Sequence, residues 1–186
     1  MTAAEPMLVA GRSCAGCTMC CKLLAVEALA KPRGVLCPHC TAGVGCGIYP
    51  TRPDECQRFY CAFMSDAGLG EHWRPANAKM MIVRERTGIV VHVDAARPGA
   101  WRSEPFYSDL KRLAAGAARN RGVILVKQGA RAFALMADRE QDLGNLRPDQ
   151  VIAVQEGKGP MTGRLEVFVL EPDDPRIPAE MRGARQ

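Results

Sequence analysis

Nine cysteines dominate the chemistry that this 186-residue chain could perform, and all of them lie in its first third. They are Cys14, Cys17, Cys20, Cys21, Cys37, Cys40, Cys46, Cys56 and Cys61. A secreted protein would use such a cluster as a disulfide framework, but an odd count and a start without the features of a secretory signal indicate a reducing compartment. Clustered thiols are typically metal ligands there, so the sequence predicts a thiolate-rich metal site.

The densest pattern is the CxxCxxCC run over residues 14–21. A two-residue gap lets a tight turn aim two thiolates at one ion, and the same gap recurs in the CPHC segment at residues 37–40. This is close to the paired spacing of tetrahedral zinc sites. If residues 14–21 are helical, the adjacent thiols of Cys20 and Cys21 diverge, and they suit two nearby ions or one bridged cluster. Alternatively, one of the two is a buried free thiol.

Two other side chains within the cluster could tune the thiolates. His39, between Cys37 and Cys40, is either a ligand or a hydrogen-bond donor to a thiolate, and we favour the donor because the thiols suffice for two sites of four. Arg52 can offset negative charge, since a four-thiolate zinc site carries a net charge of about −2. The alternative is that Arg52 is a surface arginine with a solvated head.

The order of the expected helices and strands along the chain predicts an α+β fold. A small metal-stabilised cysteine-rich module is followed by a small antiparallel sheet with one packed helix. Residues 1–64 hold every cysteine but few large apolar side chains, so we expect metal to substitute for an ordinary core. Residues 65–79 form a connector and residues 80–172 an α+β domain. Residues 173–186 form a charged tail that we expect to be mobile.

Alternating apolar residues predict the strands of this sheet, and apolar residues at helical spacing predict the helix against it. The predicted strands are 80–84 and 88–93, joined by a turn at 85–87, then 122–127 and 132–136, and finally 151–154 and 164–170. The helix spans 104–119, with Ser103 as its cap and Pro105 in its first turn. A further helix begins at Pro53 and carries Cys56 and Cys61 as far as residue 64.

The cysteine pattern also carries a resemblance. After the run at 14–21 come Cys37-Pro38-His39, Gly45-Cys46-Gly47-Ile48-Tyr49, Arg52-Pro53, Cys56 and Phe59. In order and spacing this resembles the YkgJ-type cysteine-cluster family, described as a zinc- or iron-chelating domain, over about residues 14–64. The resemblance implies metal chelation and no particular reaction. A similar cluster in flagellin lysine methylases is associated with iron–sulfur binding.

The resemblance bears on which thiols bind metal. Two four-thiolate ions demand eight sulfurs, one fewer than the chain offers. Cys40 stands where the family has leucine, so we expect it to be spare. The predicted ligands are then Cys14, Cys17, Cys20, Cys21, Cys37, Cys46, Cys56 and Cys61. Alternatively Cys61 is the spare, because a helix from Pro53 would turn it away from Cys56.

The leading functional hypothesis is a non-enzymatic protein that binds two zinc ions, for structure or for interaction with a protein partner. The first alternative is an iron–sulfur protein, because Cys14, Cys17 and Cys20 match the first three ligands of a bacterial ferredoxin run and Cys56 could supply the fourth. Against it, Cys21 follows Cys20 directly, whereas that run places its next cysteine three residues further on. Metal delivery to another protein is a further alternative.

The net charge of +5 at first favours nucleic acid as a partner. Eight thiolates and two divalent ions would lower that charge to about +1, which removes most of the argument. The Arg–Phe–Tyr grouping at residues 58–60 keeps a zinc-dependent nucleic-acid-binding module as an alternative.

Signatures of common enzymes are missing from the sequence, including the dinucleotide-binding glycine loop, the Walker loop, the nucleophile elbow and the HExxH zinc motif. We therefore expect no catalysis by this chain alone. No 18 apolar residues run together, so we expect no membrane partner. With no secretory signal, a cytoplasmic location is the expectation.

Overall fold

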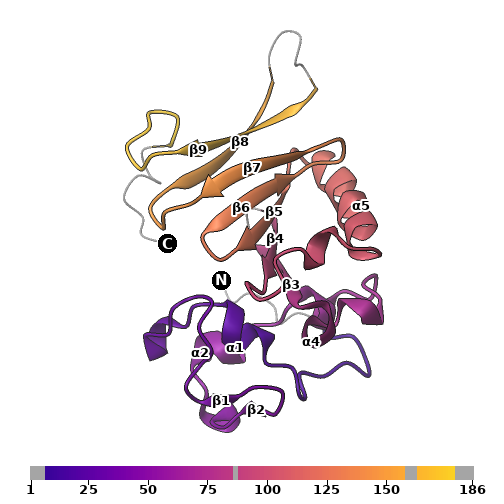
Figure 1. The fold of residues 1–186 in the computed structure, drawn as a ribbon, viewed down its shortest axis with the longest axis vertical. Helices are drawn as coiled ribbons and strands as arrows, with labels where there is room; N and C mark the ends of the chain where they lie inside the picture. The colour runs from indigo at the N-terminus through magenta and orange to yellow at the C-terminus, as the bar shows by residue number, and fades with distance from the viewer. Residues whose placement is uncertain (1–6, 86–87, 158–162, 179–186) are drawn as a thin grey trace.

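A five-stranded sheet forms the centre of the fold, and the cysteine-rich residues lie beneath one end of it (Figure 1). The computed structural model describes residues 7–85, 88–157 and 163–178. The strands are β3 (Met80–Glu85), β4 (Gly88–Val93), β5 (Ile124–Gln128), β6 (Arg131–Leu135) and β7 (Glu140–Asn145), in that spatial order. The fold is a mixed α and β arrangement with few helices, as the sequence predicts. The predicted turn at 85–87 lies partly outside the described residues.

The predicted hairpins β3–β4 and β5–β6 are both confirmed, but β4 and β5 pair in parallel. The prediction of a purely antiparallel sheet is therefore wrong at this point. The chain between the two strands contains the helix α5 (Phe106–Ala118), which returns it to the end of the sheet where β4 began. A strand that follows such a crossover runs parallel to the one before it.

Strand β7 takes the sheet edge next to β6, so the last two strands do not extend the sheet as predicted. Instead, β8 (Val151–Glu156) and β9 (Leu165–Leu170) form a separate antiparallel ribbon. The ribbon packs its apolar side chains on one face of the sheet, where Val167 joins Val123, Ala134 and Met136 in a hydrophobic cluster. Apolar burial rather than strand pairing thus joins the ribbon to the sheet.

The other face of the sheet carries the main core. Helix α5 buries Leu110 and Ala114 there, as its sequence period predicts, although it is shorter than predicted at both ends. Pro105 occupies the N-cap position, and the hydroxyl of Ser103 donates to the carbonyl of Ala100 at 2.7 Å instead of capping the helix. Trp101 is fully buried beside the helix.

Short elements make up the cysteine-rich region, which shares the main core with the sheet. They are α1 (Met19–Leu23), β1 (Cys40–Thr41), β2 (Gly45–Cys46), α2 (Asp54–Gln57), α3 (Ala62–Ser65) and α4 (Pro75–Ala78), with single 3-10 turns at Glu27–Leu29, Tyr49–Thr51, Glu71–Trp73 and Ala100–Arg102. Phe63 and Met64 of α3 pack in the same core as Trp101. Met19 and Leu23 of α1 pack on Met81 of β3.

The single helix predicted from Pro53 to residue 64 is wrong, because the chain forms α2 and α3 with an extended break at Cys61. Pro53 is the N-cap of α2 rather than its first helical residue. The break lets Phe59 pack against the α1 cluster while Phe63 reaches the main core. A continuous helix would place residues four apart on one face, so it could not direct the two rings to different clusters.

Candidate metal centre

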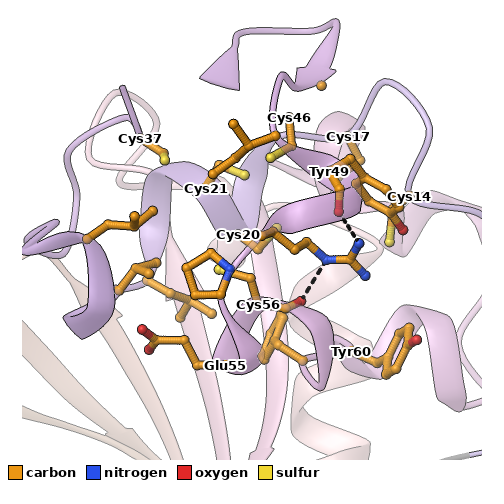
Figure 2. Close-up of a pocket in the computed structure, with 18 of the residues that line it drawn as sticks. Cys14, Cys17, Cys20, Cys21, Cys37, Cys46, Tyr49, Glu55, Cys56 and Tyr60 are labelled. Atoms are coloured by element: carbon orange, nitrogen blue, oxygen red, sulfur yellow. Dashed lines mark hydrogen bonds between the residues drawn. The ribbon is translucent and has the colours of Figure 1, made fainter. Parts of the chain in front are cut away.

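One cavity of about 740 Å³ gathers most of the thiols from separate segments of the chain (Figure 2). Seven of the nine cysteines line it: Cys14, Cys17, Cys20, Cys21, Cys37, Cys46 and Cys56. The remaining wall is largely apolar and includes Leu24, Val26, Leu29, Val44, Ile48, Phe59 and Tyr60. The fold therefore brings together sulfurs that are up to 42 positions apart in the sequence.

Tight local structure places each group of thiols. The Cys14 carbonyl accepts the N–H of Cys17 at 3.0 Å, which closes the first CxxC turn. Gly16 in this turn has φ +68°, a left-handed conformation that favours glycine, and a Cβ there would lie 3.5 Å from the Gly43 carbonyl. That distance is an ordinary contact, so the turn favours glycine for its backbone conformation and not for lack of space.

The second group is tied to the first through the backbone. The Cys37 N–H donates to the Cys21 carbonyl at 2.9 Å, and β1 pairs Cys40 with Cys46 of β2. Cys56 reaches the cavity from α2. Three separate pieces of local structure therefore fix the positions of the later cysteines relative to α1.

The thiols surround the cavity without converging on one point. All nine cysteines are free thiols. Within residues 7–85, 88–157 and 163–178, no group of three or more His, Cys, Asp or Glu side chains is placed to hold a metal ion. Sulfurs that share a tetrahedral zinc ion lie about 3.8 Å apart, given a Zn–S distance of about 2.3 Å. The donor chemistry fits a soft metal, and ligation requires the side chains to close inward.

Hydrogen bonds between thiols make Cys21 more acidic than its neighbours Cys20 and Cys40. A hydrogen bond from Cys20, then one from Cys40 and the charge of Lys31, outweigh burial and lower the pKa of Cys21 to about 6. The same hydrogen bond raises the pKa of Cys20, while burial followed by the charge of Cys21 raises that of Cys40 to about 12. Of these three thiols, Cys21 therefore loses its proton most easily.

Lys31 supplies a buried positive charge that sequence reasoning missed. The residue is 4% exposed, and its ammonium donates to the carbonyls of Leu24 and Pro32, the latter at 3.1 Å. Burial lowers its pKa, and the charges of Cys37 and Cys21 act in the opposite direction. No carboxylate in the described part of the chain forms an ion pair with it, so the thiols of Cys37 and Cys21 are the groups that can balance its charge when they ionise. Lysine is so rarely buried that no sequence signal identifies this position.

Arg52 lines the cavity, but its side chain hydrogen-bonds to the backbone and not to a thiol. Its Nη1 donates to the Tyr49 carbonyl at 2.7 Å and its Nε to the Cys56 carbonyl at 3.3 Å, and its guanidinium stacks 3.8 Å from the centre of the Tyr49 ring. Burial raises the pKa of Cys14, and the charge of Arg52 opposes that rise. The guanidinium thus anchors the loop before α2 and places a positive charge on the Cys14 side of the cavity.

Three of the predicted site residues lie outside the cavity lining. His39 is exposed, and its carbonyl accepts the Gly47 N–H at 2.7 Å. Cys40 is buried behind Cys21, and Cys61 is the N-cap of α3 and packs against the core. Their predicted roles as thiolate partner, spare thiol and ligand remain predictions.

A scan against protein-family models and searches of curated proteins and of solved structures found no significant match to this chain. The resemblance to the cysteine-cluster family therefore stays a prediction. No helix in the described ranges is long and apolar enough to cross a membrane.

Proposed function

We propose that the cavity binds two zinc ions through thiolates, and that this centre stabilises the cysteine-rich region for interaction with a protein partner. The observation that carries this proposal is the convergence of seven free thiols on one cavity. Clustered free thiols with no disulfide are the donor set of structural zinc sites.

The number of thiols supports a two-ion centre. Two tetrahedral ions that share one bridging sulfur need seven thiolates, which equals the number that line the cavity. Such a centre carries a net charge of about −3. Lys31, whose charge interacts with Cys37 and Cys21, and Arg52, whose charge acts on Cys14, would offset about two of these charges. Zinc would hold the short elements together where apolar side chains are few.

An iron–sulfur cluster is the second candidate, and the large volume of the cavity favours it. A cluster spans several ångströms and is held by four thiolates, so its ligands need not converge on one point as those of a single ion must. The absence of a convergent three-ligand group in the described residues and the largely apolar wall both agree with such an occupant.

We do not extend the proposal to nucleic acid. Arg58 pairs with Asp54 at 3.1 Å, and Phe59 packs against the α1 cluster. The grouping at residues 58–60 therefore presents no exposed stack of arginine and aromatic side chains for bases.

Elemental analysis of protein purified anaerobically without chelator tests the proposal. We expect about two zinc per chain, a colourless solution, and loss of amide-exchange protection in residues 14–64 before the sheet when a strong chelator is added. A brown protein with acid-labile sulfide and absorption near 400 nm would replace zinc by the iron–sulfur candidate. Less than about half an equivalent of every transition metal would refute both.

A further inference from the structure

A second, smaller cleft lies on the sheet face that α1 covers. It is lined by Lys22, Leu23, Arg33, Gly34, His92, Val93, Asp94, Ala95, Lys127 and Gly129. Met81, His92 and Lys127 are register partners across β3, β4 and β5, so they form one row on this face. Figure 1 shows α1 beneath this end of the sheet. The cleft has a volume of about 40 Å³, more than the 10–15 Å³ that one water requires.

The single carboxylate in the lining is already used. Both oxygens of Asp94 accept from the Lys22 ammonium at 2.7 Å, and one of them also accepts the Ala96 N–H at 3.0 Å. The Asp94 side chain is 8% exposed. Lys22 and Asp94 therefore neutralise each other, and the rest of the cleft determines its net charge.

Two cations remain without an anionic partner. Among the described residues, neither Arg33 nor Lys127 forms an ion pair. Burial and the charge of Arg33 lower the pKa of Lys127, and only the more distant charge of Glu85 opposes them. Like charges beside one another in a half-buried cleft are unfavourable unless a counter-ion joins them.

His92 adds a neutral donor between these two cations. The residue is 3% exposed, and its Nδ1 lies 3.1 Å from Nη1 of Arg33. The guanidinium can only donate, so Nδ1 accepts and the proton of the neutral ring is on Nε2. Burial, Arg33 and Lys127 together lower the pKa of His92, which keeps the ring neutral. Every polar side chain of the cleft that is not already paired is thus a donor.

We infer that this cleft binds a phosphate group, held by Arg33, Lys127 and the Nε2–H of His92. A phosphate dianion balances the two unpaired cations, and a guanidinium and an ammonium are the side chains that most often bind phosphate. The cleft is small, so a phosphate ester would keep its organic part outside. Bound phosphate would tie the loop at residues 31–36 to β5. This inference does not depend on the metal proposal.

Isothermal titration calorimetry with inorganic phosphate at constant ionic strength tests the inference on the protein as purified. We expect saturable one-to-one binding, weakened at least about tenfold by Lys127→Met and by Arg33→Gln. Arg119→Gln, at an exposed arginine of the helix end, is the matched control and should leave binding unchanged. Phenyl phosphate distinguishes the source, because equal affinity indicates a phosphate ester and weaker affinity indicates the free ion.

Two results would overturn the inference. One is the absence of saturable heat up to about 20 mM phosphate, since two unpaired cations beside the buried His92 should bind phosphate below that range. The other is binding that survives in both cleft variants, which would place the phosphate elsewhere, for example on bound metal. Circular dichroism checks that each variant folds. If Lys127→Met does not fold, Lys127→Arg is measured in its place, and it should retain binding because it keeps the charge.

Discussion

The buried histidine of β4 should make the protein sensitive to mild acid. His92 is 3% exposed, and burial, followed by the charges of Arg33 and Lys127, lowers its pKa from 6.5 to about 3. The unfolded chain therefore binds a proton at a pH where the folded chain does not. Stability must fall as pH falls through 6.5, and the loss continues down to about pH 3.

The size of this loss follows from the two pKa values. At pH 5 the unfolded histidine is almost fully protonated and the folded one is neutral, so unfolding is favoured by about 2 kcal/mol relative to pH 8. His92→Gln removes the titrating group while its amide oxygen can still accept from Arg33. Between pH 8 and 5, the variant should lose about 2 kcal/mol less stability than the wild-type protein.

Urea unfolding at several pH values between 8 and 5, in buffers free of phosphate and sulfate, measures this difference. The lowered pKa of Cys21 acts in the same direction, because its thiolate is lost as pH falls through about 6, but it is common to both proteins and cancels. If wild type and His92→Gln lose the same stability within about 0.5 kcal/mol, His92 is not held neutral by the fold and the reasoning is wrong.

Three further substitutions test the site and the core. Cys56→Ser should remove about one equivalent of metal while Cys61→Ser keeps the full content, measured by elemental analysis, because only the first thiol lines the cavity; equal losses would contradict this assignment. Leu110→Ala should lower the free energy of unfolding in urea by about 2–5 kcal/mol, since this side chain of α5 is fully buried against the sheet. Arg12→Met should lower the melting temperature by several degrees, because it leaves three backbone carbonyls in residues 63–69 without their donor.

The local elements of the sheet could be predicted from the sequence because each has a strong short-range signal. The β3–β4 hairpin has two apolar runs a few residues apart, and α5 repeats its buried positions at helical spacing. Strand β7 has the sequence EQDLGN, with no β-branched residue, and only pairing with β6 makes it a strand. Parallel pairing of β4 and β5 likewise depends on the path of α5 across the sheet, which no local pattern encodes.

The site divides in the same way between short-range and tertiary signals. Spacing predicts which cysteines form turns, and Cys17 does bond back to Cys14. Spacing cannot predict which thiols face a common cavity, because that depends on the break between α2 and α3 and on the β1–β2 hairpin. Lys31 could not be identified either, since its burial depends on two backbone carbonyls that accept hydrogen bonds from its ammonium.

Helix α1 explains why the cysteine-rich region and the sheet are not independent. An isolated helix of five residues is unstable in water, so its contacts must hold it in place. Its successive residues face different neighbours: Cys20 and Cys21 line the thiol cavity, Lys22 pairs with Asp94 of the phosphate cleft, and Leu23 packs with Met81 of β3. Closing the thiols on metal would therefore fix α1 against the sheet, and the sheet in turn positions two of the thiols. The stability of each part is expected to depend on the other, because this one short element contributes side chains to the cavity, the cleft and the core.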